Sequence, residues 1–204
     1  MRKLLVSALV WCVCIAGTAS AQQARTGGAR GQAGAPVDQH RVNPVGAANA
    51  AFQKRLQDYL QLRGELTKTF PEVKETGDPN KISAREKALG HAIAASRKDA
   101  KPGYLFGPDM TPVFTQIVTA DWKRRSPADR KAMFNELPQG THVRVNEPYP
   151  TTLPLLTVPS NLLVNLPVLP DDLEYRIIDR HLLLRDRDAN LVVDGLFNIF
   201  PKVE

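Results

Sequence analysis

The stretch that decides the fold is LEYRIIDRHLLLRDRDANLVVDGLFNIF, residues 173–200. It contains three short runs rich in leucine, isoleucine and valine, separated by residues that are mostly Asp, Asn and Arg. Apolar runs of this length between turn-forming residues predict antiparallel strands joined by tight connections. We expect strands over 173–178, 181–186 and 190–195, which together form a three-stranded meander.

Consecutive apolar residues occupy the centre of each expected strand: Ile177-Ile178, Leu182-Leu183-Leu184 and Leu191-Val192-Val193. A sheet with one face in water would instead alternate apolar and polar side chains. Both faces should therefore be covered, because three short strands are not stable alone. We expect helices on one face and the segment 153–170, a second copy or a partner on the other.

Spacing and capping signals predict four helices before the sheet. An apolar stripe at helical spacing begins near Asn49. Ser83 and Glu86 have the spacing of a capping box, while Thr111 and Ser126 are each followed by a proline suited to the first helical position. We expect helices over about 49–66, 83–97, 112–124 and 127–136.

Between helices and sheet lies a proline-rich segment that is also rich in leucine and valine. Its prolines exclude a long helix. An extended strap over apolar surface, with a short helix around 160–165, fits both properties. The expected class is α+β, with an N-terminal bundle of about four helices (49–138) and then the strap and three-stranded antiparallel meander (139–204).

The first 21 residues have the features of a cleaved signal peptide. Arg2 and Lys3 precede the apolar run LLVSALVWCVCIAG, and small residues end at Ala21. A retained membrane anchor is the alternative, although the run is short for one. A lipoprotein is another, with Cys12 or Cys14 as the modified residue. We predict a periplasmic or secreted protein without a transmembrane helix after processing.

Removal of this leader would change the composition of the chain. Both cysteines leave with it, which excludes disulfides, thiolate nucleophiles and cysteine-bound zinc. Lys plus Arg falls from 27 to 25 against 21 acidic residues, so the net charge becomes about +4. This mild basicity gives no reason to expect a specific nucleic-acid partner.

Residues 22–48 are rich in Gly, Ala, Gln and Arg and have few large apolar groups. Such a segment buries too little surface to offset its ordering entropy, so we predict a disordered tether. Arg25, Arg30 and Arg41 could contact anionic lipid or polymer, and a solvated spacer is the alternative.

Asp186, Asp188 and Asn190 have the D-x-D-x-N spacing that opens a calcium loop. A helix-loop-helix calcium site also needs Gly at its sixth position and Glu at its twelfth, where this chain has Leu191 and Phe197. Asp and Asn are common in connections between strands. We interpret the stretch as a structural turn.

No catalytic residue, cofactor-binding residue or metal ligand is assigned from the remaining polar residues. The histidines have no i,i+4 pair, Ser160 lacks the glycines of a nucleophile elbow, and a basic cluster suits a helix C-terminus. Three carboxylates near 172 read as exposed turn residues. The residues considered are His40, His91, His142, His181, Ser160, Lys123, Arg124, Arg125, Asp171, Asp172 and Glu174.

The run LPDDLEYRIIDRHLLLRDRDANLVVDGL, residues 169–196, resembles the C-terminal signature LPxxLEYRxxxRxLxLRDxxANLxVD of a group of uncharacterised exported bacterial proteins. Its strand-turn-strand pattern is also similar to small exported modules of the periplasmic nickel/cobalt homeostasis family. The His-rich tracts suited to metal handling are missing, so no ligands are carried over. The resemblance implies export and no particular activity.

Apolar surface is plentiful and reactive groups are few, which favours a non-catalytic interaction or structural protein of the cell envelope. Its expected partner is a protein, either a second copy or an envelope component. A basic binder of anionic polymer or lipid and a hydrolase with an unrecognised site are the alternatives.

The leader generates a direct prediction about the exported form. Cleavage after Ala21 leaves a chain that begins at Gln22, and intact-mass spectrometry of the secreted protein measures this. A secreted species that still contains Trp11 would contradict the expectation.

Overall fold

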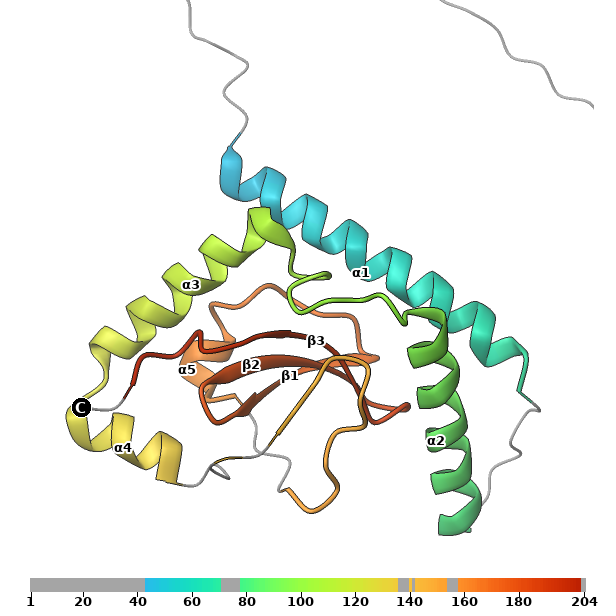
Figure 1. Cartoon of the computed structure of the whole chain (residues 1–204). Coiled ribbons are helices and arrows are strands. Elements are labelled where there is room, and N and C mark those ends of the chain that lie inside the picture. Colours follow the sequence, from blue (N-terminus) through green and yellow to red (C-terminus); the bar gives the residue numbers. More distant parts are fainter. Residues whose placement is uncertain (1–42, 71–77, 136–139, 141, 154–157, 203–204) are drawn as a thin grey trace, which may run out of the picture. The chain divides into compact units, whose positions relative to one another are not determined.

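All the described helices precede the described strands in the chain, so the fold is α+β as predicted (Figure 1). The computed structural model describes residues 43–70, 78–135, 140, 142–153 and 158–202, all within the unit Arg41–Glu204. The predicted signal peptide and most of the tether lie outside these residues. The described elements are α1 (Pro44–Lys68), α2 (Pro79–Ser96), α3 (Gly107–Arg124), α4 (Pro127–Asn135), α5 (Ser160–Leu163), β1 (Leu173–Ile178), β2 (His181–Asp186) and β3 (Leu191–Leu196).

The three strands form an antiparallel sheet in the order β1-β2-β3, which confirms the predicted meander. Asp179 and Arg180 connect β1 to β2, and Asp179 has a φ of 49°. Asn190, with a φ of 46°, ends the connection from β2 to β3. Asp and Asn tolerate this left-handed conformation better than most residues. The third strand begins at Leu191, one residue later than expected.

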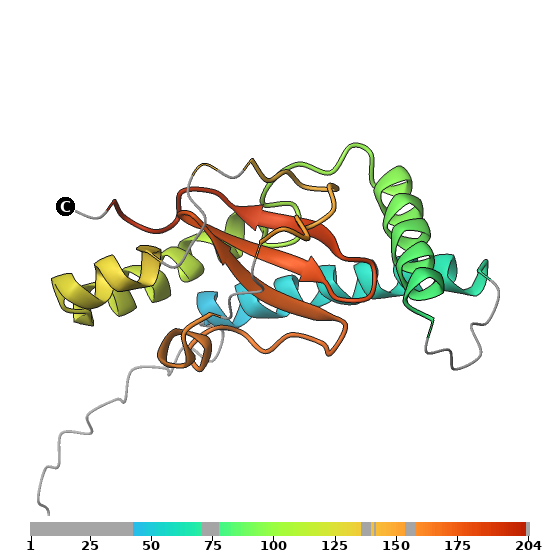
Figure 2. The same cartoon turned by 90° about the horizontal axis from the view of Figure 1, so that it is seen from below.

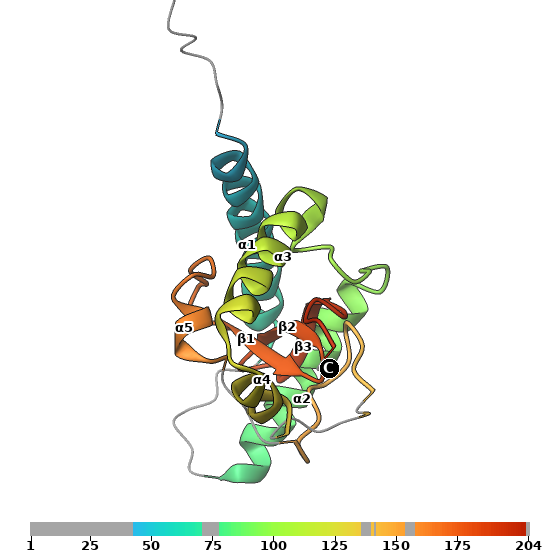
Figure 3. The same cartoon turned by 90° about the vertical axis from the view of Figure 1, so that its left-hand side faces the viewer.

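One face of the sheet packs against the helices. Figures 2 and 3 show α1 and α3 on the same side of the strands, and α1 packs against both α2 and α3. Phe52, Phe106 and Phe114 form the centre of this layer, with ring centroids 4.9 to 5.9 Å apart. Phe114 also contacts Tyr175 of β1, at 5.9 Å between centroids. These rings join the helices to the sheet in one apolar core.

The opposite face of the sheet is also covered, which confirms that apolar residues at the strand centres lie in two layers. A second cluster contains Val143, Tyr149, Ile178, Leu183 and Val192. The prediction that 153–170 provides this cover holds only for Leu153, which packs against the second cluster. Val158, Leu162 and Leu166 lie instead in the core on the helix side. The main covering segment is 143–149, which Figure 1 shows on the side of the strands opposite α1 and α3.

Backbone hydrogen bonds along the outer edge of β3 explain this position. The Asn146 N–H donates to the Val192 carbonyl at 2.8 Å, and the Val192 N–H donates to the Glu147 carbonyl at 3.0 Å. The Tyr149 N–H donates to the Asn190 carbonyl at 2.8 Å. The segment therefore pairs an edge that would otherwise be open to other chains. Proline content does not reveal this pairing in the sequence.

Helix α1 begins at Pro44 rather than near Asn49, so residues 44–48 belong to it and not to the predicted tether. The Asn43 side chain accepts a hydrogen bond from the Val45 N–H at 3.1 Å. Asn at the N-cap and proline at the first helical position are both favourable for a helix start. The large buried apolar residues of α1 begin only at Phe52, which explains why the stripe indicated a later start.

Two predicted N-caps are wrong. Helix α2 starts at Pro79, capped by Asp78, so Ser83 lies within it. Helix α3 starts at Gly107, and Pro112 is inside the helix. Gly107 has a φ of +75°, and a Cβ there would come within 2.5 Å of Arg55, so this start depends on glycine.

The predictions for the two remaining helices are confirmed. Helix α4 starts at Pro127, and the Ser126 hydroxyl accepts a hydrogen bond from the Asp129 N–H at 3.1 Å. The short helix α5 starts at Ser160. Its Leu162 is buried in the core on the helix side of the sheet.

The two-layer arrangement predicts a large effect of Leu183→Ala. Leu183 is fully buried in the second cluster, so truncation should lower the free energy of unfolding by about 2–5 kcal/mol. Arg187→Ala, at an exposed position in the β2–β3 connection, should change it by no more than about 0.5 kcal/mol. Denaturant melts measure both, and a neutral Leu183→Ala would mean that this face is open.

Candidate functional site

The D-x-D-x-N stretch is a turn, as predicted, and it also attaches the sheet to α1. Asp186 is fully buried. Its carboxylate accepts hydrogen bonds from the Tyr59 hydroxyl at 2.6 Å, Arg63 Nε at 2.8 Å and the Ala189 N–H at 2.9 Å. Protein donors therefore surround this carboxylate. Burial and the neighbouring Asp186 charge raise the pKa of Tyr59, which keeps its hydroxyl protonated as a donor.

Arg63 gathers three carboxylates at the same place. It pairs with Asp172 at 3.0 Å, Asp186 at 2.8 Å and Asp188 at 2.5 Å. Burial alone would lower the pKa of Arg63, but the carboxylates outweigh it and the pKa is raised. Asp172 and Asp188 thus belong to an ion-pair network that joins α1 to the start of β1 and to the β2–β3 connection.

Glu174 is a strand residue that pairs with two arginines, so its interpretation as an exposed turn residue is wrong. It accepts from Arg176 Nη2 and Arg185 Nη1, each at 2.5 Å. Burial opposes ionisation of Glu174, but these bonds dominate and lower its pKa. Asp171 is exposed, as expected, and its carbonyl accepts from Arg187 at 3.1 Å.

Asp194 in β3 is a buried carboxylate that the sequence reasoning did not identify. It is fully buried and accepts from the backbone N–H groups of Gly103, Leu105, Phe106 and Gly195 at 2.6 to 2.9 Å. Burial raises the pKa of Asp194, and the four donors limit that rise. A single acidic residue within an apolar strand was the available signal.

The remaining residues considered from the sequence do not form one site. His91, His142 and Ser160 are exposed, whereas His181 accepts a hydrogen bond at Nδ1 from the Asn198 N–H at 2.9 Å. Among the described residues, no recorded hydrogen bond or ring contact joins His142 to His181. His40 lies outside the described residues.

The basic cluster at the end of α3 is divided between two roles. Arg125 donates to Asp121 at 2.6 Å and to Asn161 at 3.0 Å, which ties α3 to the start of α5. Lys123 and Arg124 are exposed. The expectation of a structural role is therefore confirmed for Arg125.

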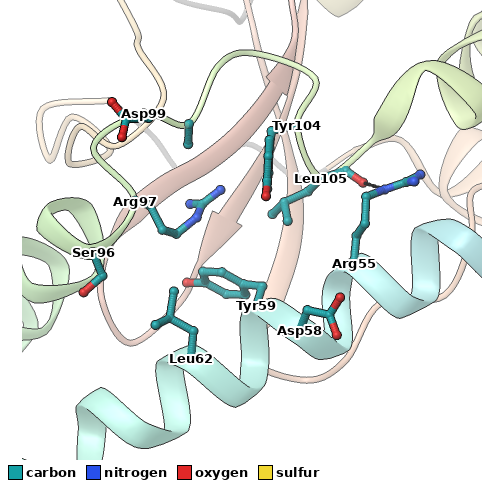
Figure 4. A pocket seen from close by; sticks show the side chains of 10 residues that line it. Arg55, Asp58, Tyr59, Leu62, Ser96, Arg97, Asp99, Tyr104 and Leu105 are labelled. Carbon is teal, nitrogen blue, oxygen red and sulfur yellow. Dashed lines mark hydrogen bonds between the residues drawn. The ribbon is translucent and has the colours of Figure 1, made fainter.

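A cleft of about 490 Å³ lies between α1 and the connection from α2 to α3 (Figure 4). Arg97 is its buried cation, and the guanidinium carbon lies 5.2 Å from the centroid of the Tyr59 ring. Tyr104, which is 62% exposed, stands on the opposite side of the opening. The volume is in the range of small-molecule sites. The sequence reasoning did not identify Arg97, because an arginine after an alanine-rich helix has no distinctive spacing.

A second hollow, an apolar groove of about 440 Å³, lies between residues 158–169 and β1. Val164 and Val168 line it and are 78% and 82% exposed. Leu162 and Leu166 of the same segment are buried on the helix side of the sheet. The segment thus attaches through two leucines and presents two valines to solvent.

Comparison with protein-family models, curated proteins and solved structures finds no match for this chain. In the described part of the chain, no helix combines the length and apolar character needed to cross a bilayer. The same residues contain no group of three or more His, Cys, Asp or Glu side chains that could hold a metal ion. The predicted likeness to exported proteins stays a prediction.

His181 predicts a pH dependence of stability. Burial and the nearby Arg180 charge lower its pKa below 6.5, so the folded state prefers the neutral imidazole. The stability that depends on a neutral His181 is fully present above about pH 6.5, and it is lost as the pH falls from there through the folded-state pKa. In His181→Asn the amide oxygen can still accept from the Asn198 N–H. The free energy of unfolding of this variant should therefore depend less on pH between about 6.5 and 5. Urea melts between pH 7.5 and pH 5 measure it, with exposed His91→Asn as control.

Proposed function

We propose that this chain is an exported, non-catalytic interaction protein of the cell envelope that associates with a second copy of itself through the apolar surface of residues 163–169. The observation that carries the proposal is the pair Val164 and Val168, which are 78% and 82% exposed at the rim of an apolar groove. Water contact with such side chains is unfavourable, and burial in an interface removes it.

This segment concentrates the exposed apolar side chains of the described residues. Three of the six large ones, Leu163, Val164 and Val168, lie within it. The other three, Val45, Ile82 and Tyr104, lie on α1, α2 and the connection to α3. Single exposed apolar residues are ordinary on a protein surface, whereas a cluster beside a groove is typical of an interface.

The geometry favours a second copy as the occupant because the surface contains both protruding valines and a groove that can receive them. A two-fold symmetric interface places the same patch of each subunit against its copy, so it requires a self-complementary surface. Val164 and Val168 of one copy would enter the groove of the other, which Leu166, Pro167 and Tyr175 help to line.

Two further features support the remainder of the proposal. The predicted leader that ends at Ala21 supports export. Asp172 and Glu174, considered for acid–base chemistry from the sequence, are both paired with arginines, which supports a non-catalytic role. Their oxygens hold elements of the fold together.

Sedimentation velocity on the chain from Gln22 tests the association. The wild type should shift from monomer to dimer as its concentration rises, and Val164→Asp with Val168→Asp should remain monomeric. A buried, unpaired carboxylate in the interface makes association unfavourable. The fold should be retained because both positions are largely exposed.

Ile82→Asp is the matched control, because Ile82 is an apolar residue on α2 that is 52% exposed. It should associate as the wild type does. A wild type that stays monomeric at every concentration, or a double variant that dimerises normally, contradicts self-association through this surface. Loss of dimer in Ile82→Asp alone would place the interface on α2 instead.

A further inference from the structure

Arg97 combines deep burial with neutral partners. The residue is 9% exposed, and burial lowers its pKa. Its Nη1 donates to the Asn146 side-chain oxygen at 3.2 Å, and its Nη2 donates to the Val193 carbonyl at 2.9 Å. No ion pair is recorded for it among the described residues. Buried cations in proteins are usually paired, so this one differs from the well-paired Arg63.

Arg97 has N–H donors beyond the two that make these hydrogen bonds. A guanidinium has five N–H donors, and two of those of Arg97 make the bonds above. No buried side-chain nitrogen or oxygen in the described residues lacks a hydrogen-bond partner. Arg97 is among the residues that line the cleft, so its remaining N–H groups are available to a ligand there.

The other charged side chains that line the cleft either form ion pairs or point away from Arg97. Arg55 pairs with Asp109 at 2.9 Å, and Asp58 pairs with Lys54 at 2.6 Å. Figure 4 shows the carboxylate of Asp99 pointing away from Arg97. Among the residues that line the cleft, Arg97 is therefore the cation that forms no salt bridge. The Asp194 carboxylate of β3 interacts with it electrostatically, but that carboxylate already accepts hydrogen bonds from four backbone N–H groups.

Apolar and aromatic groups line the rest of the interior. The Tyr59 ring lies against the guanidinium, and Leu62 and Leu105 also line the cleft. Tyr104 stands beside Leu105 (Figure 4). The Tyr59 hydroxyl is already bonded to Asp186, so this residue presents its ring. Such surfaces favour an apolar or aromatic ligand body with a single anionic end.

We infer that this cleft binds a small organic carboxylate with an aromatic or aliphatic body, whose carboxylate contacts the open donors of Arg97 and whose body lies between Tyr59 and Tyr104. A carboxylate suits a guanidinium because two oxygens can accept from adjacent N–H groups. The cleft shares no residue with the apolar surface of 163–169, so this inference is independent of self-association.

Isothermal titration calorimetry of the chain from Gln22 with 3-phenylpropanoate tests the inference, with 3-phenylpropanamide as the neutral probe of matched shape. The acid should bind with one site per chain and about tenfold more tightly than the amide, because a charged hydrogen bond is stronger than a neutral one. Arg97→Gln should bring the affinity for the acid down to that for the amide.

Two further variants separate binding from folding. Tyr104→Ala removes an exposed wall and should weaken the acid and the amide together by about tenfold, consistent with loss of one aromatic contact. Arg124→Gln removes an exposed cation on α3 and should bind both probes as the wild type does. Circular dichroism melts establish that each variant is folded.

Equal affinity for the two probes, or no binding of the acid at millimolar concentration, overturns the inference. So does a folded Arg97→Gln that binds the acid as tightly as the wild type. If Arg97→Gln does not fold, the wild-type comparison of acid with amide and the Tyr104→Ala result decide. If Tyr104→Ala binds both probes as tightly as the wild type does, the binding site is not this cleft.

Discussion

The whole structure depends on the covering of a small sheet that is apolar on both faces. Three strands bring Leu184 and Val193 to one side, and Leu183 and Val192 to the other. A sheet of this size cannot bury its own faces, and water contact on either one would be unfavourable. The helices therefore meet one face, and the chain between α4 and α5 crosses the other.

Two buried aspartates attach α1 and the connection between α2 and α3 to the sheet. Asp186 binds α1 through Tyr59 and Arg63, and Asp194 binds the connection between α2 and α3 through backbone N–H groups. Apolar packing is not directional, so it brings layers together without selecting one orientation. Hydrogen bonds to a buried carboxylate have defined directions, and loss of one partner leaves a costly unpaired group.

Two surfaces beside these layers carry the proposals. The connection held by Asp194 includes Gly103 and Leu105, so it forms one wall of the cleft over Arg97. In the segment before β1, Leu162 and Leu166 are buried in the core, whereas Val164 and Val168 remain exposed to water.

The sequence by itself determined the strands, the turns between them and the need for two covers, because strand spacing and turn chemistry are local properties. It also determined α4, whose cap is Ser126. Tertiary structure alone decided which segment covers the second face, since backbone pairing with β3 leaves no pattern in residues 143–149. It likewise decided that Asp186 binds Tyr59 and that Arg97 donates to the neutral oxygens of Asn146 and Val193. These contacts join residues far apart in the chain, and their energies depend on burial that only the folded chain creates.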